Sequence, residues 1–140
     1  MAVSRDGNEL AVFVSRAKTD QGKSANRIML VNLSDPTRPP RFLNVAPSLN
    51  PVFNSPGPVQ NCGIHFTPDD KALALSVEER GVDNIWIVPL DGSTPHRLTD
   101  FKTMHILDFR WSHDGKLLGV SRFVNDANVM LLTDTSSSKL

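Results

Sequence analysis

The chain has 140 residues, of which 15 are basic and 15 are acidic, so it carries no net charge at neutral pH. This balance disfavours binding to nucleic acid or to an anionic lipid surface, because both need concentrated positive charge. No apolar stretch approaches the roughly 18 to 20 residues that span a bilayer, so we expect no membrane insertion by this chain. The single cysteine, Cys62, excludes a disulfide within the chain.

The first predicted elements are strands on either side of a tight turn. The turn is Ser4-Arg-Asp-Gly7, in which Gly tolerates a positive φ and Asp can bond the backbone that follows it. The chain begins so close to this turn that the strand before it should be nearly absent. The apolar run from Ile28 to Leu33 predicts a further strand, and the polar stretch from Ala17 to Ala25 predicts an exposed hairpin tip.

A proline-rich segment follows these strands. Seven of the ten prolines lie between Pro36 and Pro58, which prevents an internal strand and predicts a long surface loop over about residues 47–60. Loops on a rigid scaffold often carry recognition, and in this loop Leu49, Val52 and Phe53 are apolar residues in an otherwise polar setting. We expect either that these residues contact a partner or that the loop packs Phe53 onto the neighbouring sheet.

The second half of the chain contains two matching segments, Gly63 to Leu75 and Leu107 to Val120. Each begins with alternating apolar and polar residues, the period of a strand, and passes through a turn into a second apolar run. Asp114 follows Asp69 by 45 residues, a spacing typical of four-stranded propeller blades. Asp69 follows Asp6 by 63 residues, and the excess indicates an insertion in the first repeat.

Further strands follow each turn. The run at Ile28 aligns with Ile85 to Leu90 and with Val129 to Thr133, and a short fourth strand is predicted from His96 to Thr99. The near-continuous apolar character of residues 128–133 suits a strand that is covered on both faces. The sequence therefore predicts an all-β chain of about three β-propeller blades, each a four-stranded antiparallel sheet.

The predicted bounds are about 1–46 for the first blade, 47–60 for the proline-rich loop, 61–101 for the second blade, 104–133 for the third blade and 134–140 for a polar tail. Propellers typically close with about four to eight blades, and closure removes exposed strand edges. Three blades form a partial propeller. We expect either a piece of a longer propeller or a homodimer in which two copies close a six-bladed ring.

Three segments carry a family resemblance. Phe66-Thr-Pro-Asp-Asp-Lys71, Ile85-Trp-Ile-Val-Pro-Leu-Asp-Gly92 and Arg97-Leu-Thr-Asp-Phe-Lys102 resemble the TolB-like (PD40, WD40-like) β-propeller repeat. Three segments near the end of the chain, Leu98–Lys102, Ile106–Arg122 and Asp126–Leu132, also resemble the closing blades of propellers attached to bacterial membrane Ser/Thr protein kinases. The match covers residues 60–133 and is weak over 1–59. Asp70 stands where Gly is usual and His113 where Pro is usual, so the type of these turns is open.

The resemblance implies a non-catalytic module that binds a protein, a peptide or another ligand, as the C-terminal sensor part of a bacterial signalling protein. Such a module would lie outside the cytoplasm or in the periplasm. One alternative is a TolB-type periplasmic interaction scaffold. A second alternative is the propeller that gates a prolyl-oligopeptidase-like serine peptidase. The Ser-rich tail argues against this second alternative. The last three residues, Ser138-Lys-Leu140, match a peroxisomal address that we interpret as incidental in a bacterial protein.

The sequence contains no motif that predicts catalysis. There is no Gly-x-Ser-x-Gly elbow, and the four histidines lack the spacing of metal ligands. Residues 17–24 resemble the end of a phosphate-binding loop, but Ala17 replaces its first Gly, and a strand follows where a helix is needed. We therefore expect no enzyme activity, no cofactor and no metal.

The candidate binding residues come from the innermost strands, which line the central channel of a propeller. By register, His65 and Arg110 share the face opposite to the packing residues, and Asp108 lies on the same face as Arg110. We expect His65, Asp108 and Arg110 to present a polar channel surface to a peptide or a small anion. The alternative is a structural ion pair of Asp108 with Arg110 or Arg122.

Overall fold

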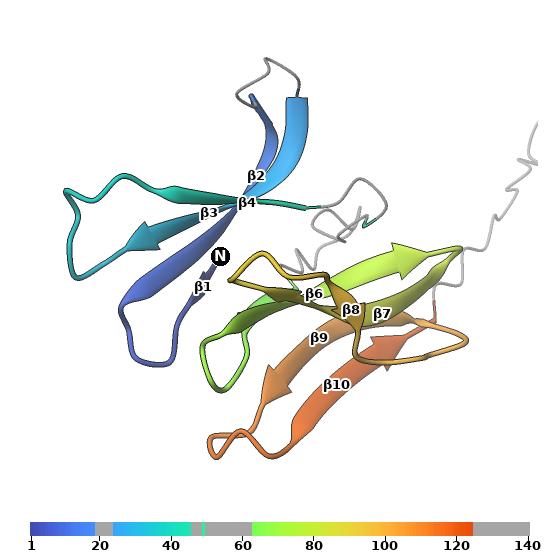
Figure 1. Ribbon diagram of the computed structural model, residues 1–140. Coiled ribbons are helices and arrows are strands. Elements are labelled where there is room, and N and C mark those ends of the chain that lie inside the picture. The colour runs from blue at the N-terminus through green and yellow to red at the C-terminus, as the bar shows by residue number, and fades with distance from the viewer. Residues whose placement is uncertain (19–23, 46–48, 50–62, 125–140) are drawn as a thin grey trace, which may run out of the picture.

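The computed structural model describes residues 1–18, 24–45, 49 and 63–124. Over these residues the chain forms ten strands and no helix (Figure 1). The strands make two four-stranded sheets and one two-stranded sheet, and every strand pair is antiparallel. The prediction of an all-β chain is thereby confirmed for the described residues.

Each sheet is built from strands that follow one another along the chain. The first sheet contains β1 (Ala2–Val3), β2 (Glu9–Lys18), β3 (Ser24–Asn32) and β4 (Arg41–Asn44). The second contains β5 (Ile64–Phe66), β6 (Ala72–Glu79), β7 (Val82–Pro89) and β8 (His96–Arg97). The third contains β9 (His105–Trp111) and β10 (Leu118–Phe123). As expected from the sequence, β1 is very short, with two residues.

Two of the predicted strands are only partly matched by the described structure. The fourth strand of the second sheet, predicted over residues 96–99, ends at Arg97. The reason is that the backbone N–H of Ile85 donates to the side-chain hydroxyl of Thr99, at 2.9 Å, where a longer strand would offer a carbonyl. The strand predicted at residues 128–133 lies outside the described residues, so the third sheet is described only by two strands.

The same turn follows β1, β5 and β9. In each copy a Ser or Thr hydroxyl donates to the aspartate two residues later, at 2.6 to 2.7 Å, and the three pairs are Ser4–Asp6, Thr67–Asp69 and Ser112–Asp114. The hydroxyl also accepts the backbone N–H five residues later in all three copies. The hydroxyl is the largest cause of a lowered pKa at each of these aspartates. The repeat predicted from the sequence thus extends to single hydrogen bonds.

Asp70 keeps the geometry of this turn although it replaces glycine. Its φ is +54°, against +75° at Gly7 and +73° at Gly115 in the equivalent positions. Asp is one of the few residues that enter the left-handed region, because its short polar side chain can bond locally. His113, which stands where Pro is usual, likewise leaves the hydrogen bonds of its turn unchanged.

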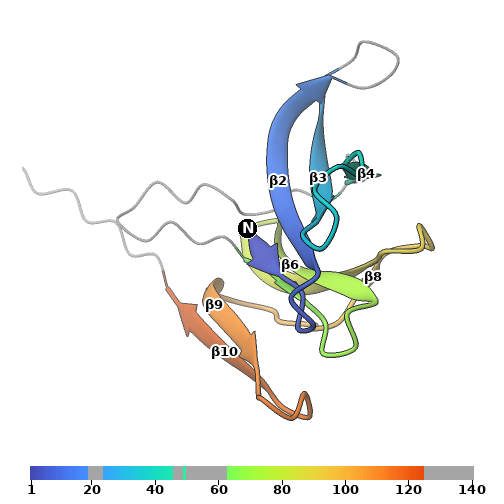
Figure 2. The ribbon, with the colours of Figure 1, turned by 90° about the vertical axis from the view of Figure 1, so that its left-hand side faces the viewer.

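The second sheet lies between the other two and is buried on both faces (Figures 1 and 2). Its strand β6 is buried at six consecutive positions, Ala72 to Val77. Residues that alternate along β6 pack on opposite sides. One set, Leu73, Leu75 and Val77, joins a cluster with the first sheet. The first sheet contributes Ala11, Ile28 and Leu30 to this cluster. The other set, Ala72 and Ala74, joins a cluster with the third sheet. This cluster also contains Ile85 and Ile87 of β7 and Ile106 and Phe109 of β9.

A buried carboxylate links the second and third sheets. Asp83, at the start of β7, is 1% exposed, accepts the backbone N–H of Ile106 at 2.9 Å and lies 3.2 Å from Nδ1 of His105. The next residue, Asn84, accepts the Thr99 hydroxyl and the Phe101 N–H through its side-chain oxygen. These bonds fix the path of the chain from β8 to β9.

Candidate functional site

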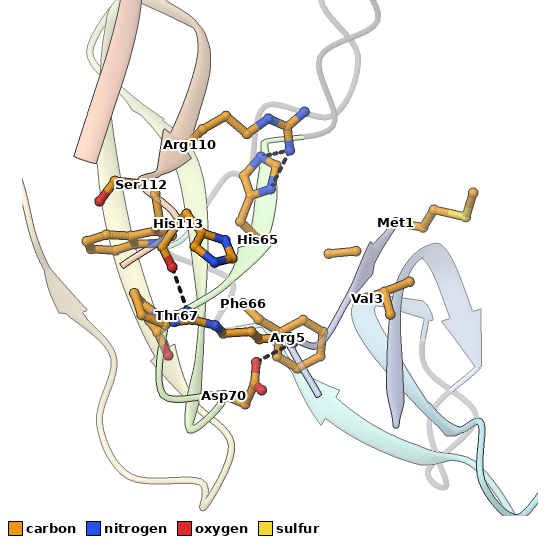
Figure 3. A pocket seen from close by; sticks show the side chains of 13 residues that line it. Met1, Val3, Arg5, His65, Phe66, Thr67, Asp70, Arg110, Ser112 and His113 are labelled. Carbon is orange, nitrogen blue, oxygen red and sulfur yellow. Dashed lines mark hydrogen bonds between the residues drawn. The ribbon is translucent and has the colours of Figure 1, made fainter. Parts of the chain in front are cut away.

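A pocket of about 430 Å³ opens between the first strands of the three sheets. Each sheet contributes its first strand and the turn that follows it (Figure 3). The lining residues are Met1, Ala2, Val3 and Arg5 from the first sheet; His65, Phe66, Thr67, Pro68 and Asp70 from the second; and Arg110, Trp111, Ser112 and His113 from the third. The pocket therefore exists only because segments more than 100 residues apart converge.

The pocket has an apolar side and a polar side. In Figure 3, Met1 and Val3 lie across the opening from His65 and Arg110. Val3 is 55% exposed, which leaves an apolar surface available to a ligand. A mixed lining of this kind is usual for sites in which a few polar groups orient a ligand against apolar walls.

The structure brings together the three residues predicted from the sequence. Nη1 of Arg110 lies 2.8 Å from Nδ1 of His65, and Nε of Arg110 lies 3.3 Å from Asp108. Nε2 of His65 is 3.7 Å from the other oxygen of Asp108. The arrangement fits a neutral imidazole that accepts from Arg110 at Nδ1 and points its Nε2–H toward the carboxylate. His65, Asp108 and Arg110 thus form one polar cluster on β5 and β9.

Burial keeps the imidazole of His65 neutral. Loss of hydration lowers the pKa of His65 to about 4, the positive charge of Arg110 acts in the same direction, and Asp108 opposes both. The ring also packs edge-on against Phe109, with 4.8 Å between centroids. At neutral pH the positive charge of this cluster therefore belongs to Arg110, whose side chain is 67% exposed.

Arg5 and Asp70, which the sequence did not indicate as candidate binding residues, complete the site. The carboxylate of Asp70 accepts the backbone N–H groups of Arg5, at 2.8 Å, and of Asp6, at 3.2 Å. The guanidinium of Arg5 donates to the backbone carbonyl of His113. One arginine thus bridges all three turns (Figure 3). The available signal was the glycine replaced by Asp70, but the sequence does not indicate which partner its carboxylate would find.

The hydroxyl groups in the pocket are already engaged. Thr67 donates to Asp69 and Ser112 donates to Asp114, each within its own turn. Neither hydroxyl has a histidine as its hydrogen-bond acceptor, which an activated nucleophile requires. The polar groups of this pocket can bind and orient a ligand, but they do not form a nucleophile with its base.

Of the two ion pairs considered for Asp108, with Arg110 or with Arg122, the structure contains the first. Asp108 pairs with Arg110, whereas Arg122 lies over the ring of Phe101, 3.9 Å from its centroid, and donates to the carbonyl of Thr103. A bulge in the pairing of β10 with β9, between Ser121 and Arg122, accompanies this placement. A structural role for the Asp108–Arg110 pair and a role in binding are compatible, because most of the Arg110 side chain stays exposed in the pair.

Of the three residues predicted to contact a partner from the proline-rich loop, only Leu49 lies within the described part of the chain. Leu49 is 6% exposed and belongs to the cluster between the first and second sheets, so its side chain is part of the core and offers no surface to a partner. The sequence-based assignment of Leu49 to a contact surface is therefore not supported. Val52 and Phe53 lie outside the described residues.

Comparison with protein-family models finds no matching family, and comparison with curated proteins finds no match. The resemblance to TolB-like repeats therefore stays a prediction. Within the described ranges no group of three or more His, Cys, Asp or Glu side chains is arranged to hold a metal ion. The part of the chain that the structure describes also contains no helix long and apolar enough to cross a membrane.

Proposed function

We propose that this chain forms part of a β-propeller and binds, without catalysis, a protein or peptide ligand in the pocket between β1, β5 and β9. The single observation that carries the proposal is the convergence of the three first strands on one pocket, each followed by the same hydrogen-bonded turn. In a propeller, the first strands of the blades surround the central channel, where ligands can reach several blades at once.

The chemistry of the pocket favours a carboxylate beside an apolar group. Arg110 and Arg5 supply two guanidinium groups, and guanidinium binds carboxylate in two-point geometry. Both oxygens of Asp70 are occupied by backbone N–H groups, which reduces repulsion of an anion. Val3 and Met1 give the apolar surface opposite. A peptide that ends in an apolar residue with a free carboxylate matches these features.

The kinase-linked resemblance adds a biological setting to this proposal. On that basis we propose that the chain is the sensor or interaction part of a bacterial signalling protein. A non-catalytic role agrees with the engaged hydroxyl groups of Thr67 and Ser112.

The proposal is tested by calorimetric titration with acetylated Ala-Leu that carries a free C-terminal carboxylate, using the C-terminal amide as the control ligand. We expect the acid to bind and Arg110→Ala to weaken it at least about tenfold, because a charge-assisted hydrogen bond contributes roughly 1.5 to 3 kcal/mol. Arg38→Ala, at an exposed arginine that does not line this pocket, should leave the affinity unchanged.

Thermal unfolding of the same variants separates binding from stability. The Asp108–Arg110 pair is exposed, so Arg110→Ala should change the free energy of unfolding by at most about 1 kcal/mol. Equal binding of acid and amide, or a destabilised Arg110→Ala variant with unchanged affinity, would reject the binding site.

A further inference from the structure

The third sheet has a polar face that continues from the pocket. Cross-strand partners share a face of a sheet, and so do residues two apart along a strand. Arg110 of β9 pairs with Gly119 of β10, and Asp108 pairs with Ser121. These four residues form the polar face of the third sheet. Arg110, Gly119 and Ser121 are exposed, and the Asp108 side chain is 40% exposed. Because Arg110 also lines the pocket, the polar face begins at the pocket's edge and extends toward β10, which lies beyond β9 (Figures 1 and 2).

Within the described part of the chain, Gly119 has no conformational or steric reason to be glycine. It lies inside β10, where glycine weakens a strand because it is flexible and has no side chain to pack. Its φ is not positive, unlike that of four other described glycines, and the bulge of β10 comes after it. A Cβ placed on it would make an ordinary contact, 3.7 Å from the carbonyl oxygen of Arg110, whereas a Cβ on Gly63 would lie 2.9 Å from Cβ of Ser76. Such a glycine often marks a place where a ligand or another segment approaches the backbone closely.

The repeat also indicates a close approach at this position. With the aspartates of the three turns aligned, Ala11 and Ala74 correspond to Gly119. Both alanines are 0% exposed, because the following sheet packs over each of them. The neighbours of Gly119 on its own face are charged or carry a hydroxyl, so an apolar sheet does not fit there. A polar ligand does.

We infer that a peptide bound in the pocket continues over Gly119 and forms hydrogen bonds with Asp108 and Ser121. The inference rests on the proposed function, because Arg110 would hold the terminal carboxylate of the peptide. Gly119 then leaves room for the peptide backbone beside the guanidinium. The Ser121 hydroxyl can donate and accept, and the Asp108 carboxylate has acceptor capacity beyond its contacts with Arg110 and His65.

The spacing of the polar face matches an extended peptide. Asp108 lies two residues from Arg110 along β9, which corresponds to roughly 7 Å. An extended ligand advances at most about 3.3 to 3.6 Å per residue, so two of its residues cover this distance. A carboxylate at Arg110 therefore places the N–H groups of the preceding residues near Asp108 and Ser121. This accounts for an acidic side chain beside a carboxylate site, since a carboxylate accepts peptide N–H groups.

The experiment compares a short and a long ligand by calorimetric titration of the wild-type chain. Acetyl-leucine reaches only the pocket, whereas acetylated Ala-Ala-Ala-Leu with a free carboxylate also reaches the polar face. We expect the long ligand to bind at least about tenfold more tightly, because it forms additional hydrogen bonds. Equal affinities would overturn this inference and leave the proposed function standing. If neither ligand binds, the proposed function fails and this inference fails with it.

Substitutions assign the gain from peptide length to the polar face. Gly119→Val should remove the gain, so that both ligands bind alike, because the new side chain fills the space beside Arg110. Its melting temperature should equal or exceed that of the wild type, because strands favour β-branched residues. Leu98→Val, at a 43% exposed leucine that does not line the pocket, should keep the gain.

A second variant on the polar face keeps the test decisive. Ser121→Ala removes one hydrogen-bonding group and should lose part of the gain. A gain that survives Gly119→Val excludes this path for the peptide. If Gly119→Val does not fold, Ser121→Ala decides, and an unchanged gain in that variant would overturn the inference.

Discussion

Among the titratable groups of the described residues, His65 has the pKa that is shifted furthest. Its side chain is 14% exposed, it accepts a hydrogen bond from Arg110, and its pKa of about 4 keeps it neutral at physiological pH. A neutral imidazole costs less to bury than a charged one, and it holds the guanidinium in place without repelling it. His65 therefore acts by positioning Arg110 rather than as a cation.

The lowered pKa of His65 predicts a loss of stability in acid. Between pH 6.5 and about 4 the unfolded chain binds a proton at His65 and the folded chain does not, so stability is complete above pH 6.5 and falls toward pH 4. The full difference corresponds to at most about 3 kcal/mol. A titration of the imidazole followed by NMR should have its midpoint near 4, and His65→Gln should flatten this part of the pH–stability curve. A midpoint near 6.5 would contradict the burial of the ring.

At the scale of the elements, the three turns pack against one another at one end of their sheets. Gly115 shows how closely they pack, because a Cβ placed on it would lie 2.5 Å from Cβ of Pro68 in the neighbouring turn. Asp70 and Arg5 add hydrogen bonds between the same turns. The turns therefore connect the sheets as well as ending the strands.

Two glycine substitutions separate the packing of the turns from their backbone conformation. Gly115 has φ +73° and Gly92 has φ +83°, but nothing lies within 4 Å of a Cβ placed on Gly92. Both alanine variants should lose roughly 1 to 2 kcal/mol for the left-handed conformation. Gly115→Ala should lose about 1 to 3 kcal/mol more, because Pro68 must move. Equal losses in urea denaturation would mean that the turns do not pack as described.

Local patterns in the sequence predicted most of the strands and the proximity of the candidate binding residues. The alternation of apolar and polar residues over 107–111 predicted the strand β9. Aligning its turn with the turn after β5 predicted that Arg110 lies near His65. This works because a strand and a tight turn are determined by neighbours in sequence.

The rest depends on contacts across the chain, for which the sequence carries no local signal. The hydrogen bond from Arg5 to the carbonyl of His113 spans 108 residues. No sequence pattern distinguishes Asp83 and His105, which lie within hydrogen-bond distance, from the other Asp and His residues of the chain. Leu49 resembled an exposed loop residue because its neighbours are polar, yet it is buried in the core. Its burial depends on sheets that are distant in the sequence.

At the scale of the whole molecule, the second sheet holds the other two in place. It contributes to both buried clusters, and the pocket lies where the first strands of all three sheets meet. The described part of the molecule is therefore an array of sheets whose common end forms the pocket.

The most direct test is an NMR titration of the ¹⁵N-labelled wild-type chain with acetylated Ala-Leu that carries a free carboxylate. We predict saturable shifts at Arg110 Nε–H and at the backbone amides of Val3, His65 and Trp111, which come from three different sheets but line one pocket. Absence of shifts at millimolar peptide, or shifts confined to residues far from β1, β5 and β9, would contradict the account.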